Sequence, residues 1–349
     1  MDYSGTILRG SSFEPVEGTI SVVDGTIDEI SPEPTDSETI IAPAFVNAHT
    51  HLGDSIAKEA GEGLTLEELV APPDGLKHRL LEAADDATLV DGMGRSLRYA
   101  ARSGSVACYD FREGGRDGVD LLREAATGVP IDAVALGRGP PDVVEHADGY
   151  GASGANDDDF AEARQTARAA GKPFGIHAGE ASPDDLDPAL DLDPDFLVHV
   201  VHPEPTHLDR IESTGTPVVV CPRSNHLTRV GRAPIETLVD RTTVALGTDN
   251  AMLNAPNMFR EMAFVATITD CSAVEVLGMA TRNGATLLGR RDGVLEPGRP
   301  ANLVLLDGDS DNLVGYRDPV RALVRRATVE DVIDVIYRGS PVSSTLGTD

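Results

Sequence analysis

Two histidines one residue apart, His49 and His51, end an apolar stretch that opens at Ala42. The stretch is typical of a short buried strand, and in an extended chain residues i and i+2 point to the same side. Both imidazoles can therefore face one point, and neutral imidazole is a common ligand for divalent metal ions. A pair alone is more often an ordinary polar strand end, so a metal site needs further ligands.

Three more residues with metal-binding side chains end apolar stretches later in the chain: His177, His199 and Asp249. The carboxyl ends of parallel strands meet at one edge, so we expect these residues to lie near the histidine pair. Several neutral imidazoles and one carboxylate suit zinc or ferrous iron. A position left to water makes such a site catalytic, since the ion lowers the pKa of water from about 16 to about 7.

Residues at this predicted centre also suit proton transfer. Asp249 can bind metal with one oxygen and accept the proton of the water with the other. Glu180, three residues beyond His177, can move a proton to a ring nitrogen or a leaving group, a role typically worth ~10²–10⁴-fold in rate. His199, protonated or polarised, would stabilise the incoming hydroxide or a developing oxyanion. We therefore predict Glu180, His199 and Asp249 as catalytic residues.

Alternating β and helical patterns must position these side chains. Between residues 42 and 291, eight strand candidates are separated by helical patterns such as Asp86–Arg102. This alternation predicts an α/β fold with a parallel sheet, and eight units predict a closed, TIM-like (β/α)8 barrel. Residues 52–82, punctuated by Gly and by Pro72 and Pro73, predict a loop that covers the site. The strand candidates are 42–49, 105–110, 130–136, a weak one at 145–150, 173–177, 195–199, 217–221 and 243–249.

Both ends of the chain carry β patterns instead. Asp24-Gly25 between two β-rich runs predicts a hairpin, and residues 301–307 and 332–337 return to β patterning. We therefore predict a small discontinuous β-sandwich domain formed by residues 1–41 and 292–349, beside a barrel domain of residues 42–291. A barrel of this kind commonly needs about 250 residues, which a chain of 349 residues accommodates.

Six short motifs cover nearly the whole chain. They are Asn47-Ala-His-Thr-His51-Leu-Gly, His177-Ala-Gly-Glu180, His199-Val-Val-His202, Cys221-Pro-Arg-Ser-Asn225, Leu246-Gly-Thr-Asp249 and Leu295-Glu-Pro-Gly-Arg-Pro-Ala-Asn-Leu-Val. Together they resemble the amidohydrolase superfamily, and within it the aminohydrolase branch of guanine, cytosine and S-adenosylhomocysteine deaminases and triazine hydrolases. The resemblance implies that Glu180 is the proton shuttle and that His199 lies beside the metal-bound water. It also implies four metal ligands, His49, His51, His177 and Asp249.

The number of metal ions can also be predicted. Other branches of this superfamily bridge two ions with a carboxylated lysine at the end of the fourth strand. This chain has no lysine between residues 145 and 152, and Lys172 precedes the fifth strand candidate. We therefore predict one divalent ion, zinc in the first place and ferrous iron as the alternative. Cys108, Cys221 and Cys271 are far apart and odd in number, so they indicate neither a disulfide framework nor a zinc ribbon.

Substrate contacts are expected from polar residues that follow the strand candidates: Arg112, Glu113, Arg138, Arg223 and Asn225. Arginine forks recognise carboxylates, phosphates and carbonyl-rich rings. The same arginines would equally serve to balance neighbouring acidic side chains. Tryptophan is absent and aromatic residues make up only 4% of the chain, which weakens the case for a stacked purine base.

The net charge of −29 argues against a nucleic-acid or anionic-membrane partner, because like charges repel. The acidity is dispersed and lysines are few, which predicts a halophile's protein and not an acidic binding tail. No basic-then-apolar leader opens the sequence, and no apolar run approaches ~18 residues. We therefore expect a cytoplasmic protein with a small-molecule substrate, and homo-oligomer formation stays open.

These residues lead to one preferred function and two alternatives. The preferred function is metal-dependent deamination of an amino-substituted N-heterocycle, such as a nucleobase, a nucleoside or a pterin-like compound. The first alternative uses the same site to hydrolyse a cyclic amide or amidine C–N bond or to dehalogenate a ring. A non-catalytic metal-binding barrel is the remote alternative, because a structural metal site needs neither a proton shuttle nor an open position.

Overall fold

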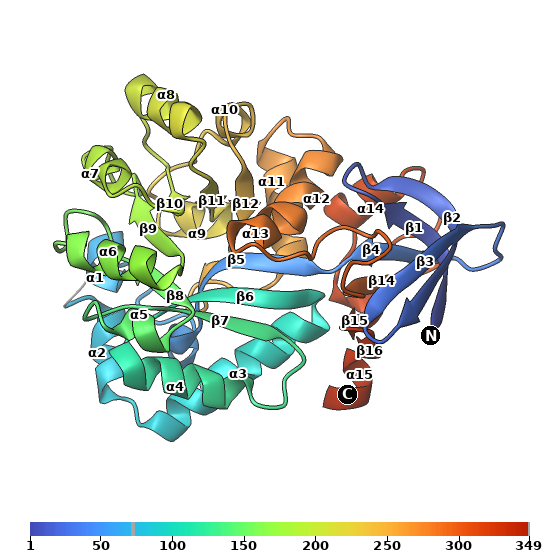
Figure 1. Cartoon of the computed structure of the whole chain (residues 1–349), viewed down its shortest axis with the longest axis horizontal. Coiled ribbons are helices and arrows are strands. Elements are labelled where there is room, and N and C mark those ends of the chain that lie inside the picture. Colours follow the sequence, from blue (N-terminus) through green and yellow to red (C-terminus); the bar gives the residue numbers. More distant parts are fainter. Residues whose placement is uncertain (71–73, 348–349) are drawn as a thin grey trace.

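A curled parallel sheet and a second, separate sheet organise the chain (Figure 1). The computed structural model describes residues 1–70 and 74–347. Its nine-stranded sheet has the order β12-β11-β10-β9-β8-β7-β6-β5-β13, with only parallel pairs. The strands are β5 Phe45–His51, β6 Ser105–Arg112, β7 Asp132–Gly137, β8 Gly149–Ala152, β9 Phe174–Ala178, β10 Phe196–His199, β11 Val218–Val220, β12 Val244–Leu246 and β13 Asp249–Asn250.

The sheet curls because its two outermost strands are consecutive in the chain. Only Gly247 and Thr248 separate β12 from β13, yet β12 pairs with β11 and β13 pairs with β5. Alternate residues of six of these strands form one apolar cluster that includes Val46, Tyr109 and Phe196. The enclosed face of the sheet is therefore packed with side chains.

Helices follow most of these strands. Helix α3 begins after Asp85, whose carboxylate accepts a hydrogen bond from the Thr88 backbone N–H at 2.8 Å. The helix buries Met93, Leu97 and Ala100. No helix among the described residues is both long enough and apolar enough to span a membrane. The helices of this region are α3 Asp86–Arg102, α4 Gly115–Ala126, α5 Val143–His146, α6 Ala161–Ala170, α7 Leu186–Asp191, α8 Pro205–Thr214, α9 Pro222–Leu227, α10 Ile235–Val239, α11 Met258–Ile268, α12 Ala273–Ala280 and α13 Arg282–Leu287.

The weak strand predicted at residues 145–150 is wrong over its first half. Val143–His146 form the short helix α5, and the strand β8 begins only at Gly149. An added Cβ at Gly149 would lie 2.5 Å from the Leu136 side chain and 2.7 Å from the Pro173 carbonyl oxygen. The close approach of its neighbours explains why this strand contains glycine and lacks the β-branched residues that mark a strand in sequence.

The segment predicted to cover the site contains three short helical elements, η1 Leu52–Ala57, α1 Leu66–Val70 and α2 Leu76–Ala83. Pro72 and Pro73, which punctuate the predicted loop, lie outside the described residues. Helix α2 and η1 pack together next to the carboxyl end of β5. The segment therefore lies at the end of the sheet that carries the histidines.

Both chain ends share the second sheet, whose order is β16-β15-β14-β4-β1-β2-β3. The predicted hairpin is confirmed, because β2 and β3 pair antiparallel around Asp24 and Gly25, whose φ angles are +48° and +76°. Strand β14 pairs antiparallel with β4, which joins the two ends of the chain. The elements are β1 Asp2–Arg9, β2 Glu14–Val23, β3 Thr26–Pro32, β4 Thr39–Pro43, β14 Leu303–Asp307, α14 Pro319–Arg325, η2 Val329–Asp331, β15 Val332–Tyr337, β16 Ser340–Pro341 and α15 Val342–Leu346.

A cluster of polar contacts around Asp132 links the two sheets. Asp132 begins β7, and its carboxylate accepts hydrogen bonds from Tyr337 Oη at 2.6 Å, Arg290 Nη2 at 2.7 Å and Arg338 Nη2 at 2.8 Å. Burial alone would raise the pKa of Asp132, but the hydrogen bonds from Tyr337 and Arg290 hold it below the ordinary value. The charged carboxylate therefore stabilises the folded state.

Replacing Asp132 by Asn should lower the free energy of unfolding by about 1–3 kcal/mol, because the charge-assisted hydrogen bonds are lost. A carboxyl group whose pKa is lowered on folding stabilises above its unfolded pKa, and this stabilisation is lost as the pH falls through the folded pKa. The difference between wild type and variant should thus shrink below about pH 4. Urea unfolding of wild type and variant at pH 7 and pH 3 measures this difference in the free energy of unfolding. Asp142→Asn, which removes an exposed partner of Arg116, is the matched control; equal losses in both variants would contradict the prediction.

Candidate active site

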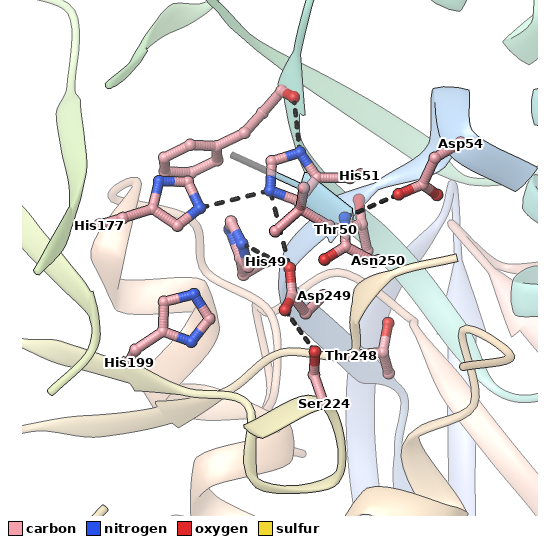
Figure 2. Close-up of polar contacts among 12 residues, drawn as sticks. His49, Thr50, His51, Asp54, His177, His199, Ser224, Thr248, Asp249 and Asn250 are labelled. Carbon is pink, nitrogen blue, oxygen red and sulfur yellow. Dashed lines mark hydrogen bonds and ion pairs between the residues drawn. The ribbon is translucent and has the colours of Figure 1, made fainter. Parts of the chain in front are cut away.

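The five predicted residues at strand ends converge at one edge of the curled sheet (Figure 2). His49 and His51 lie on β5, His177 on β9, His199 at the end of β10 and Asp249 at the start of β13. The Asp249 Oδ1 atom lies 3.3 Å from His49 Nε2 and 3.6 Å from His51 Nε2. His51 Nε2 is in turn 3.3 Å from His177 Nε2. The structure therefore brings the side chains together as the spacing predicted.

These donors fit a metal ion. Neither ring nitrogen of the fully buried His49 has a hydrogen-bond partner among the described residues, which is costly for a polar group inside a protein. His49, His51 and Asp249 offer ligand atoms within 4.8 Å of one another, and so do His49, His177 and His199. A cation between the donors would satisfy the nitrogens that the protein leaves unpaired.

The electrostatics of the centre keep the imidazoles of His49, His51 and His177 neutral. Burial lowers the pKa of His49, and burial together with the Lys77 charge lowers the pKa of His51 to about 3. The pKa of His177 falls well below its ordinary value for the same reason, burial followed by its histidine neighbours. Burial alone would raise the pKa of Asp249, but His49, whose Nε2 lies 3.3 Å from Oδ1, and the neighbouring histidines hold it well below the usual range. Neutral imidazole and ionised carboxylate are the forms that bind metal.

Contacts with neighbouring residues orient the side chains of His51, His177 and Asp249. His51 Nδ1 lies 3.1 Å from the Phe111 carbonyl oxygen and 3.0 Å from Glu113 Oε1, and His177 Nδ1 lies 2.7 Å from the Ala152 carbonyl oxygen. These contacts leave the two Nε2 atoms 3.3 Å apart, with that of His51 also 3.6 Å from Asp249 Oδ1. Ser224 Oγ donates a hydrogen bond of 2.6 Å to Asp249 Oδ2, which leaves Oδ1 facing the histidines.

Backbone strain coincides with the same site. His199 and Asp249 have positive φ angles of +78° and +59°, which side chains other than glycine rarely adopt. Such strain persists only where the surrounding structure enforces it, and it is concentrated at functional sites. His199 at the end of β10 and Asp249 at the start of β13 are therefore held in conformations that aim their side chains at the common centre.

Glu180, His199 and Asn225 form a polar group beside the metal donors. Glu180 Oε2 lies 3.6 Å from His199 Nε2. The Asn225 amide contacts both residues, at 3.3 Å from Glu180 Oε1 and 3.1 Å from His199 Nδ1. Burial raises the pKa of Glu180, which favours a carboxyl group that exchanges its proton closer to neutral pH.

A cavity of about 550 Å³ opens over this centre. Its lining includes His51, His177, Glu180, His199 and Asp249, together with Glu67, Lys77, Arg138, Asp157 and Asp185. A volume of this size admits a small ring compound. No aromatic residue apart from the histidines is among the described residues that line it.

The predicted substrate contacts divide into two groups. Arg138 lines the cavity, Glu113 holds His51, and Asn225 holds Glu180. Arg112 and Arg223 do not line this cavity: Arg112 packs between Met93 Sδ and the Glu113 carboxylate, and Arg223 bonds to Asn254. A substrate contact by these two arginines stays a prediction that the geometry does not favour.

Lys77 on α2 is a residue of the site that sequence reasoning missed. It is buried with 2% of its side chain exposed, and its Nζ atom lies 2.6 Å from Glu113 Oε1. In the sequence it stands between Leu76 and His78 in a polar, proline-rich segment, where a lysine is ordinarily solvated. The spacing of apolar residues in the sequence does not indicate that Lys77 is buried.

A parallel α/β sheet with imidazoles and a carboxylate at the carboxyl ends of its strands is the arrangement of a metal-dependent hydrolase. The model of the amidohydrolase family matches residues 40–342, and the chain belongs to this family. The resemblance seen in the sequence is thereby confirmed, as is the prediction of a hydrolase.

Relatives and solved structures agree with this placement. A provisionally named aminohydrolase of Methanothermobacter thermautotrophicus is 34% identical over 97% of this chain and 98% of its own length. A 5-methylthioadenosine/S-adenosylhomocysteine deaminase of Haloarcula marismortui is 28% identical over 92% of this chain and 85% of its own length. The zinc complex of atrazine chlorohydrolase from Arthrobacter aurescens shares the fold, with a TM-score of 0.84, 20% identity and coverage of 100% and 97% of the two chains.

Replacing His49 by Ala should reduce the divalent metal bound per chain to well below one ion, because the fully buried donor at the centre is lost. Elemental analysis of protein purified and dialysed in parallel measures the stoichiometry. His226→Ala, which removes an exposed histidine of α9, should keep the wild-type content. Unchanged metal in a folded His49→Ala variant would contradict the assignment of His49 as a ligand.

Proposed function

We propose that the protein is a metal-dependent aminohydrolase that releases ammonia from an amino-substituted N-heterocycle, such as a nucleobase, a nucleoside or a pterin-like compound. The observation that carries this proposal is the placement of Glu180, His199 and Asp249, whose ligand-type atoms lie within 4.8 Å of one another at the cavity. The relative named as a 5-methylthioadenosine/S-adenosylhomocysteine deaminase supports deamination over other hydrolytic reactions.

One divalent ion would be held by His49, His51, His177 and Asp249, which offer three imidazoles and one carboxylate. Zinc is proposed first, with ferrous iron as the alternative, and zinc in the atrazine chlorohydrolase structure supports this order. When bound, the ion supplies the Lewis acidity that makes water a nucleophile at neutral pH.

The chain's own residues then manage the protons. Asp249 is ionised and its Oδ1 faces the histidines, so its other oxygen, Oδ2, which accepts a hydrogen bond from Ser224, would accept the proton of the attacking water. Glu180, whose pKa burial raises, carries a proton to the ring nitrogen or the departing amine. Asn225 keeps Glu180 and His199 in contact, so the imidazole can stabilise charge that develops on the attacking oxygen.

A second candidate function is hydrolysis of a cyclic amide or amidine C–N bond, or ring dehalogenation, at the same site. The cavity supports it because no described lining residue other than the histidines is aromatic, so nothing there is built to stack on a purine. The same proton transfers serve both reactions, and only the leaving group differs.

The architecture supports two finer proposals. We propose that the curled sheet is a (β/α)8 barrel, in which β12 and β13 together form the eighth strand. We also propose that residues 42–291 form the catalytic domain, and that residues 1–41 and 292–349 form the β-sandwich domain.

For the partners, we propose a small-molecule substrate in the cytoplasm and no nucleic acid.

Adaptation to concentrated salt is a further proposal, supported by the net charge of −29 and by the halophilic relative from Haloarcula marismortui. Without screening, like charges repel across the surface and destabilise the compact state. Circular dichroism should therefore show a native spectrum in molar salt and partial unfolding in dilute buffer. An identical melting profile in both would contradict the proposal.

Metal-loaded protein in molar salt should release ammonia from at least one member of a panel of aminated purines, pyrimidines, nucleosides and pterins. Glu180→Gln should lower kcat on that compound by at least ~10²-fold, with metal content and folding unchanged, because the proton shuttle is lost. Glu145→Gln, an exposed residue, is the control. Full activity of folded Glu180→Gln would refute the role of Glu180 in proton transfer. If metal is bound and no compound of the panel releases ammonia, the second candidate function is favoured.

A further inference from the structure

We propose that Lys77, together with Arg138, forms an anion-binding subsite of the cavity, so that the substrate carries a carboxylate or phosphate group next to its heterocycle. The inference rests on the proposed function and narrows its substrate class. The sequence predicts a substrate contact by Arg138, whereas only the fold places Lys77 at the cavity. Lys77 is thus a specificity-determining residue.

The position of Lys77 is unusual for this chain. Of its 29 basic residues only three are lysines, Lys58, Lys77 and Lys172. Lys172 has a structural explanation, because its ammonium group binds the Val144, Glu145 and Ala147 carbonyl oxygens near the end of α5. Lys77 instead is 2% exposed and lines the cavity that holds the catalytic residues. Burying an ammonium group is expensive, so a lysine retained there requires an explanation.

Glu113 has partners besides Lys77. The Glu113 carboxylate lies 2.9 Å from Arg112 Nη2, 3.3 Å from Arg138 Nη1 and 3.0 Å from His51 Nδ1. Three donors besides Lys77 therefore face this carboxylate, and one of them, Arg112, also lies 3.7 Å from Asp110 Oδ2.

The ammonium group of Lys77 also has unused capacity. It offers three N–H donors, and Glu113 accepts at 2.6 Å. The next carboxylate, Asp54, lies 3.9 Å away, and its two oxygens accept hydrogen bonds from Asn250 Nδ2 and the Met252 backbone N–H. An anionic group in the cavity would provide acceptors in addition to those that residues 1–70 and 74–347 provide.

The remaining charges of the cavity would orient such a substrate. Glu67, Asp157 and Asp185 line the same cavity and repel an anion, whereas Lys77 and Arg138 attract it. Arg138 keeps 15% of its side chain exposed and can reach the ligand directly. With the anionic group held there, the heterocycle is left to face His177 and Glu180.

The test compares neutral and anionic compounds that share one ring. Adenosine with adenosine 5′-monophosphate examines a phosphate. 5′-Methylthioadenosine with S-adenosylhomocysteine examines a carboxylate, which S-adenosylhomocysteine carries together with an α-ammonium group; in each pair the compound with the phosphate or carboxylate is the anionic member. Metal-loaded wild type should show a higher kcat/KM on the anionic member of at least one pair. Lys77→Gln should reduce this preference by about 10- to 100-fold, mainly through KM, because a charge-assisted hydrogen bond is lost. Lys77→Arg should retain the preference, and so should Arg79→Gln, which removes an exposed cation of the same helix.

A binding measurement separates failure of this inference from failure of the proposed function. If no compound is deaminated, isothermal titration calorimetry with the same four compounds tests the subsite without any reaction. Weaker binding of the anionic member to Lys77→Gln than to wild type supports the subsite. Equal binding by wild type and folded Lys77→Gln, or no binding by either, overturns it. An unchanged kinetic preference in folded Lys77→Gln overturns it as well. Should Lys77→Gln not fold, Arg138→Gln must lose the preference for the inference to stand.

Discussion

The site depends on one reciprocal pair of hydrogen bonds between residues far apart in sequence. Asn47 Nδ2 donates to Thr248 Oγ1 at 2.7 Å, and the Thr248 backbone N–H donates to Asn47 Oδ1 at 3.0 Å. Both residues are buried, so the exchange is protected from water. It ties β5 to the link between β12 and β13, and thereby places Asp249 beside the histidines of β5.

The approach of these segments leaves no room for a side chain at Gly247. A Cβ atom there would lie 2.6 Å from His49 Cβ and 2.9 Å from the His49 backbone nitrogen. Glycine at position 247 thus allows the link between β12 and β13 to pass against His49, so that Asp249 on β13 lies beside the histidines of β5. Burial then adjusts the chemistry, since it keeps the imidazoles neutral while their contacts keep Asp249 ionised.

Much of this site can be predicted from sequence, because the residues that matter follow buried strands. Apolar runs reveal where the strands end, and a parallel sheet forces those ends to one edge, which is why His177 and Asp249 were found. The direction of a long side chain is not encoded in this way. Arg112 and Arg223 follow strands as Arg138 does, yet their flexible stems turn away from the cavity. Lys77 could not be predicted because its burial results from the packing of α2, which the neighbouring residues in the sequence do not indicate.

The pairing of β4 with β14 has a consequence for synthesis of the chain. Strands β1 to β4 pair among themselves soon after they leave the ribosome, but residues 44–302 separate β4 from its antiparallel partner. During translation one edge of β4 therefore stays open, and an open edge is a template for pairing with other chains. The sheet can be completed only after β14, β15 and β16 have emerged, long after β1 to β4.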